Sequence, residues 1–100
     1  MTIISVENVL FYSEGDEQNF FRFLESNPCV KQVTGEGRKI NIEVKDDCLD
    51  IESFLSLYAA IKRYEGECRQ LRNLITYMNK EDADYLKSTK MIWHCHIFRQ

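Results

Sequence analysis

The two histidines of the chain, His94 and His96, stand two residues apart near its C-terminus. In a strand, residues two apart point to the same face, so the imidazoles would lie side by side and Cys95 would point away. Two imidazoles supply half of a tetrahedral zinc site, and Glu43 or Asn41 would have to add a third ligand. No ligand spacing supports that metal site. We therefore expect a pair of half-buried strand histidines and no cofactor.

Acidic residues gather at the starts of two predicted helices and at the tip of a predicted hairpin. The positive end of a helix dipole favours carboxylates, which explains part of this pattern without any function. A hydrated cation site or a carboxylate pair for acid–base catalysis would use the same residue type, but the spacing favours neither. The remaining interpretation is a surface that faces a partner protein, and we assign to it Glu14, Asp16, Glu17, Glu36, Asp46, Asp47 and Asp50.

No sequence motif names a reaction. The chain lacks a G-x-S-x-G elbow, a Walker loop, a G-x-G-x-x-G turn, an H-E-x-x-H pair and an EF-hand loop. The four cysteines, Cys29, Cys48, Cys68 and Cys95, include no C-x-x-C pair, which argues against a zinc knuckle and a redox dithiol. We expect free thiols that pack as small hydrophobic groups and no catalytic residue.

Length and charge narrow the class of protein. One hundred residues make one domain, residues 1–100, with one hydrophobic core. Residues 1–50 hold ten acidic and five basic residues, a net charge of −5, and residues 51–100 hold six acidic and eight basic residues, a net charge of +2. Binding to phosphate backbones relies on clustered Lys and Arg, so we expect no direct contact with nucleic acid. An acidic half suits a basic protein partner.

The sequence shows neither a membrane span nor an export signal. No apolar run approaches the roughly 20 residues that cross a bilayer, and the N-terminus has no basic segment ahead of an apolar one. The sequence therefore predicts a cytoplasmic protein.

The clearest element is a helix over residues 50–64. Its apolar residues recur at spacings of three and four, which is typical of a helix with one buried stripe. Asp47 or Asp50 can cap its start, and Gly66 is placed to be the left-handed residue at its end. Helical spacing continues to residue 78, so one bent helix over residues 50–78 and two separate helices are both left open.

Four strands and further helices complete the pattern. Residues 38–45 alternate apolar and polar side chains most regularly, Gly35 and Gly37 predict a hairpin turn, and Asn79 is placed to cap a last helix. The expected strands are residues 2–12, 29–34, 38–45 and 91–98, and the other expected helices cover residues 14–26, 67–78 and 79–87.

The order is therefore strand, helix, strand, strand, helices, strand. With right-handed crossovers it predicts an α+β fold, a ferredoxin-like split βαβ sandwich (β-α-β-β-α(α)-β) whose four-stranded antiparallel sheet carries the helices on one face. The opposite face of the sheet would be open. Pairing of two such faces in a homodimer is an alternative that the sequence leaves undecided.

Two hypotheses for function follow. The first is a small, acidic, non-catalytic protein-binding module that inhibits or neutralises a basic macromolecular partner by electrostatic steering and steric occlusion. Immunity proteins or antitoxins that act on nuclease toxins, and inhibitors of nucleic-acid enzymes, fit this composition, which is an analogy only. The alternative is a small ferredoxin-like enzyme or ligand-binding domain that uses the open sheet face with His94 and His96.

Overall fold

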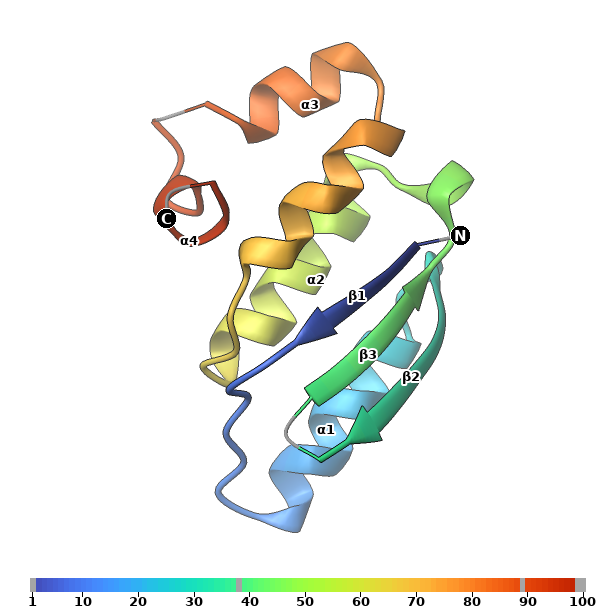
Figure 1. Ribbon diagram of the computed structural model, residues 1–100, viewed down its shortest axis with the longest axis vertical. Helices are drawn as coiled ribbons and strands as arrows, with labels where there is room; N and C mark the ends of the chain where they lie inside the picture. Colours follow the sequence, from blue (N-terminus) through green and yellow to red (C-terminus); the bar gives the residue numbers. More distant parts are fainter. Residues whose placement is uncertain (1, 38, 89, 99–100) are drawn as a thin grey trace.

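The computed structural model describes residues 2–37, 39–88 and 90–98 and contains one three-stranded sheet (Figure 1). Its strands are β1 (Thr2–Val6), β2 (Val30–Glu36) and β3 (Lys39–Val44), in the order β1-β3-β2. Because β3 is antiparallel to both neighbours, β1 and β2 run parallel, and the helix α1 (Glu14–Glu25) connects them. The N-terminal half is thus the split βαβ unit that the sequence predicts.

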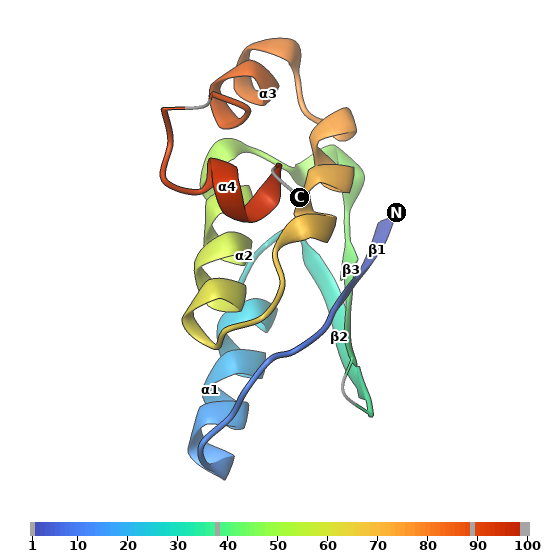
Figure 2. The same cartoon turned by 60° about the vertical axis from the view of Figure 1, so that its left-hand side comes forward.

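Two helices cover one face of the sheet and leave the other bare (Figure 2). They are α1 and α2 (Ile51–Arg63), which pack side by side. Alternation along β1 and β3 turns the apolar side chains toward these helices. The core between the two layers is fully or almost fully buried and includes Ile4, Val6, Ile42, Val44, Phe20, Leu24, Phe54, Leu57 and Ile61.

The predicted fourth strand over residues 91–98 is wrong, and with it the four-stranded ferredoxin-like sandwich. This segment contains instead the short helix α4 (His94–Ile97). Trp93 and Ile97, four residues apart, both turn inward: the Trp93 indole donates to the Leu86 carbonyl (2.8 Å), and Ile97 is fully buried. Most positions of this short segment are apolar, so its pattern fits a strand and a helix equally well, and periodicity does not decide between the two.

The free edge of β1 is also occupied, which leaves a fourth strand no partner there. The 3₁₀ helix η2 (Arg69–Tyr77) lies along it, and the Ser5 amide donates to Gln70 Oε1 (2.8 Å). A strand edge needs partners for its backbone groups, and a side chain of η2 supplies one. The expected strand over residues 2–12 therefore ends early, at Val6.

The chain after β1 leaves the sheet through Asn8, which has a positive φ of 65°. It then runs beside the segment that follows α2. The Leu10 amide donates to the Tyr64 carbonyl (2.8 Å), and the Glu67 amide donates to the Glu7 carbonyl (3.0 Å). Two backbone hydrogen bonds therefore hold segments that are more than fifty residues apart in sequence.

The helix predicted over residues 50–64 is confirmed as α2, and it ends before the next helical segment begins. Asp50 caps its start, because its Oδ1 accepts from the Ser53 amide (2.7 Å). At its end, the Gly66 amide donates to the Ile61 carbonyl (2.9 Å) and Glu65 has the positive φ of 64°. This is a Schellman ending, and its left-handed residue is Glu65 rather than Gly66, contrary to the prediction.

The helical spacing predicted over residues 67–78 is confirmed by burial of its apolar side chains, although η2 is a 3₁₀ helix. Asn79 caps α3 (Lys80–Leu86) as predicted, since its Oδ1 accepts from the Asp82 amide (2.8 Å). A single 3₁₀ turn, η1 (Asp46–Cys48), joins β3 to α2. Within the described ranges, none of these helices has the length and apolar character needed to cross a bilayer.

Cys29 and Cys48 form a disulfide, with Cα atoms 5.3 Å apart. It ties the start of β2 to η1. The expectation of four free thiols is therefore wrong for this pair, while Cys68 and Cys95 are free. Spacing along the chain could not reveal the pair, because the two cysteines are nineteen positions apart in sequence and only the sheet brings them together.

Gly66→Ala should destabilise the protein. An added Cβ would lie 2.9 Å from both Ile61 Cγ2 and Val9 Cγ2 and 3.0 Å from Val6 Cγ1, and overpacking of this kind costs roughly 1–3 kcal/mol of unfolding free energy. Chemical denaturation measures the change. Gly15→Ala in α1 is the matched control, because its Cβ would meet only Ser13 Oγ, at 3.5 Å. Equal stability of Gly66→Ala and the wild type would contradict the packing argument.

Candidate functional site

The structure divides the predicted acidic set between two ends of the molecule (Figure 1). One end holds the first turn of α1 and the tip of the β2–β3 hairpin, and the other holds η1 and the start of α2. Residues at opposite ends cannot act as one patch. Glu14, Asp16, Glu17 and Glu36 lie at the first end, and Asp46, Asp47 and Asp50 lie at the second, with the side chain of Asp46 outside the described part.

Two of these carboxylates hold local structure. Asp16 Oδ2 accepts from the Tyr12 amide (3.0 Å), and Ser13 Oγ accepts from the Asp16 amide (3.2 Å), so both fix the entry to α1. Asp50 caps α2, and the hydrogen bonds it accepts from Ser53 lower its pKa below the usual value. Their role in helix capping accounts for both positions.

A hollow of about 980 Å³ opens at the first end of the molecule. The segment after β1, the helix α1, the hairpin and the end of α2 surround it. Since it includes Phe21 and Ile40, it lies on the helix-covered side of the sheet. We call it the acid-rimmed hollow, and its lining residues are Asn8, Val9, Leu10, Phe11, Glu17, Phe21, Gly35, Gly37, Ile40 and Glu65.

Packed aromatic rings support the floor of the acid-rimmed hollow. Phe20 lies at the centre, with its ring centroid 5.4 Å from that of Phe11, 5.8 Å from Phe21 and 5.5 Å from Tyr64. The contacts of Phe20 with Phe21 and Tyr64 are edge-on, a favoured geometry for aromatic pairs. A floor fixed in this way loses little side-chain freedom when something binds to it.

Carboxylates and exposed apolar side chains surround this floor. Glu17 and Glu65 line the hollow itself. A groove along α1 continues from it through Glu17 and Phe21, and this groove adds Glu14 and Glu25 with one basic residue, Arg22. Leu10, which lines the hollow, is 45% exposed, and Tyr12, two residues later, is 81% exposed. An apolar centre with a charged rim is the usual anatomy of a protein interface.

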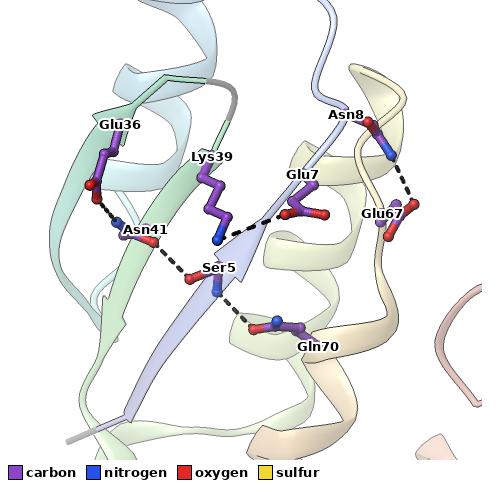
Figure 3. A network of polar contacts seen from close by, with 8 residues as sticks. All are labelled: Ser5, Glu7, Asn8, Glu36, Lys39, Asn41, Glu67 and Gln70. Carbon is purple, nitrogen blue, oxygen red and sulfur yellow. Dashed lines mark hydrogen bonds and ion pairs between the residues drawn. The ribbon is translucent and has the colours of Figure 1, made fainter.

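Sequence reasoning found part of this set and missed the rest. It identified Glu14 and Glu17 by charge alone and took Leu10 and Tyr12 for strand residues. One signal in the sequence could have shown that Leu10 and Tyr12 lie outside the strand. The expected strand over residues 2–12 is longer than the usual strand of about five or six residues. Glu36 shares this end, but its side chain lies on the bare face, where Oε2 accepts from Asn41 Nδ2 (3.4 Å; Figure 3).

The two histidines do not share a face as predicted, because they lie on α4 rather than on a strand. His96 Nδ1 makes a hydrogen bond with Tyr58 Oη (2.8 Å), and the two rings stack. The ring of His94 packs against Phe98, 5.7 Å between centroids. Among the described residues no group of three or more His, Cys, Asp or Glu side chains is placed to hold a metal ion.

The two free cysteines and His96 line a small pocket that also includes Lys62 and Arg69. Burial raises the pKa of Cys68 to about 11, and nearby Lys62 offsets only part of this effect. Cys95 is exposed. Burial also raises the pKa of Tyr58, with smaller contributions from the two thiol groups.

Comparison of the chain with protein-family models, with curated proteins and with solved structures yields no match.

The cysteines should differ sharply in reactivity toward a thiol reagent. At pH 8 a thiol of pKa about 11 is ionised to roughly one part in a thousand, and the thiolate is the reactive form. We expect one fast-reacting thiol, Cys95, in the native protein, and a second, Cys68, only after unfolding. Colorimetric titration measures both, and Cys95→Ser is the control that should abolish the fast phase. Two fast thiols in the native protein would contradict the assignment.

Proposed function

We propose that the protein is a small, non-catalytic binding module that inhibits a basic macromolecular partner by covering it. The observation that carries this proposal is the acid-rimmed hollow, where an apolar floor and several carboxylates meet on one end of the molecule. Immunity proteins or antitoxins against nuclease toxins, and inhibitors of nucleic-acid enzymes, remain the analogous classes.

The carboxylates would act during approach. A cluster of like charge attracts an oppositely charged partner over a distance of about 10 Å at ordinary ionic strength, which raises the association rate. Glu14, Glu17 and Glu65 form this cluster, and among the described residues that line the hollow and the groove Arg22 is the one basic residue. The acids at the other end, including Asp47, would contribute little because screening weakens charges at that range.

The apolar residues would act after contact. Leu10 and Tyr12 are exposed large side chains beside a fixed aromatic floor, and aromatic residues dominate interface energetics when they become buried. In this mechanism the charges set the rate of association, and the apolar residues set the rate of dissociation.

The alternative hypothesis is an enzyme or ligand-binding domain with the two histidines at the centre of an open sheet face. The structure does not place the histidines there. His94 and His96 lie on α4, away from the bare face of the sheet. We do not propose it further.

We further propose that the protein acts in the cytoplasm. The Cys29–Cys48 disulfide is the observation that argues against it, because disulfides persist mainly in oxidising compartments. Mass spectrometry of the protein trapped by alkylation in its own cells would decide: a reduced pair supports the cytoplasm, and an oxidised pair opposes it.

Neutralising the acidic end should slow association with the partner. The partner is first captured from source cells at low and at high salt and then purified. With the double variant Glu14→Gln/Glu17→Gln, we expect an association rate roughly tenfold lower at low salt and a flatter dependence on salt. Biolayer interferometry at several salt concentrations gives both quantities. Leu10→Ser should instead raise the dissociation rate.

Asp47→Asn is the control for the single variant Glu17→Gln, because each removes one predicted acid, at opposite ends of the molecule. Its association rate should equal that of the wild type. Equal slowing by Asp47→Asn and by Glu17→Gln would show that net charge, not the acid-rimmed hollow, governs approach. No effect of either variant would remove the electrostatic part of the proposal.

A further inference from the structure

A second concavity lies on the other side of the molecule, between β1 and η2, and its described lining includes no residue of the acid-rimmed hollow and neither of the two histidines. It opens onto the bare face of the sheet and has a volume of about 480 Å³, within the usual range for small-molecule sites. We call it the β1–η2 cleft, and its lining residues are Ser5, Glu7, Lys39, Glu67, Arg69, Gln70, Arg72 and Asn73.

The described residues that line the β1–η2 cleft include no apolar side chain. Most small-molecule sites are largely apolar with a few polar groups, so this composition selects a ligand that is hydrophilic over its whole surface. Within the described part of the chain, the lining also offers no aromatic ring on which a nucleobase could stack. The ligand must therefore be recognised by charge and hydrogen bonds alone.

Three basic side chains enter the β1–η2 cleft. Lys39 pairs with Glu7 (3.9 Å) and Arg69 pairs with Glu67 (3.4 Å), and all four side chains are about half exposed. Exposed pairs at such distances contribute little to stability, so an anion can displace the carboxylates. Arg72 has no ion-pair partner among the described residues.

The 3₁₀ geometry of η2 aligns the two arginines. Residues three apart eclipse in a 3₁₀ helix, with a rise of about 6 Å between them, so Arg69 and Arg72 lie in one row. One guanidinium can satisfy both oxygens of a carboxylate, whereas a phosphate monoester has three terminal oxygens and can engage two guanidinium groups. The paired arginines therefore favour phosphate over carboxylate.

The network shown in Figure 3 orients the remaining polar groups. Gln70 Oε1 accepts from the Ser5 amide (2.8 Å), which leaves the Gln70 NH₂ group to donate elsewhere. Glu67 Oε1 accepts from Asn8 Nδ2 (2.8 Å), and Ser5 Oγ donates to Asn41 Oδ1 (2.7 Å). Carboxylate oxygens of Glu7 and Glu67 retain lone pairs, and these can accept hydrogen bonds from ligand hydroxyl groups.

We propose that the β1–η2 cleft binds a phosphorylated polyhydroxy compound of the sugar-phosphate class. Arg69 and Arg72 hold the phosphate, with Lys39 supplying further positive charge. Glu7, Glu67 and Asn73 hold the hydroxyl groups. Among the described residues, this site shares no lining residue with the acid-rimmed hollow. The proposal is therefore independent of the proposed inhibitory function.

The test is a ¹H–¹⁵N NMR titration of the intact protein with glucose 6-phosphate, with inorganic phosphate and glucose as separate probes. We expect saturable shifts of amides in β1 and η2, and weaker binding of each separate probe. Arg72→Gln should weaken glucose 6-phosphate binding about tenfold or more, as loss of a charge-assisted hydrogen bond implies. Arg22→Gln is the matched control on the helix layer and should bind as the wild type does.

Four results would overturn the proposal: no saturable shift with glucose 6-phosphate, equal binding of inorganic phosphate, unchanged binding by Arg72→Gln, or tighter binding of a short single-stranded oligonucleotide at the same residues. Superposable spectra of the free variants establish that they fold. If Arg72→Gln does not fold, Arg69→Gln takes its place, because Arg69 is also exposed on η2 and lines the same cleft.

Discussion

The close approach of Gly66 to the end of β1 is the contact on which the rest of the arrangement depends. A side chain at this position would collide with Val6, Val9 and Ile61, so only glycine lets the chain return so near the sheet. Backbone hydrogen bonds between Glu7–Leu10 and Tyr64–Glu67 follow from that approach. η2 then lies along the edge of β1, where Gln70 accepts from the Ser5 amide. The sheet consequently stops at three strands.

The same contact creates both concave sites, one on each side of the sheet. On the helix-covered side, the segment after β1 and the end of α2 bring Leu10 and Glu65 to the acid-rimmed hollow. On the bare side, η2 brings Arg69 and Arg72 to the β1–η2 cleft. Carboxylates are the charged groups that line the hollow, whereas the cleft combines the basic Lys39, Arg69 and Arg72 with the acidic Glu7 and Glu67. A macromolecular partner and a small anion would not compete for one surface.

The predictions that failed share one physical cause. Residues 91–98 are apolar on both faces of a strand, and a short run of this kind fits a helix equally well. Which state forms depends on whether a strand edge is available, and η2 occupies the edge of β1. The pairing of Cys29 with Cys48 and the distance between Glu17 and Asp47 likewise depend on segments far apart in sequence. The acidic residues are grouped by residue type alone, and residue type does not show that they lie at two different ends of the molecule.

Sequence by itself determined the local elements: the alternation in β3, the existence of the helix α2, the caps of Asp50 and Asn79, and the hairpin between β2 and β3. These depend on neighbours within a few residues, where propensity and periodicity act. Tertiary structure alone decided the number of strands, the disulfide and the two concave sites. Each of those requires contacts between distant segments, and their geometry is fixed only when the whole core packs.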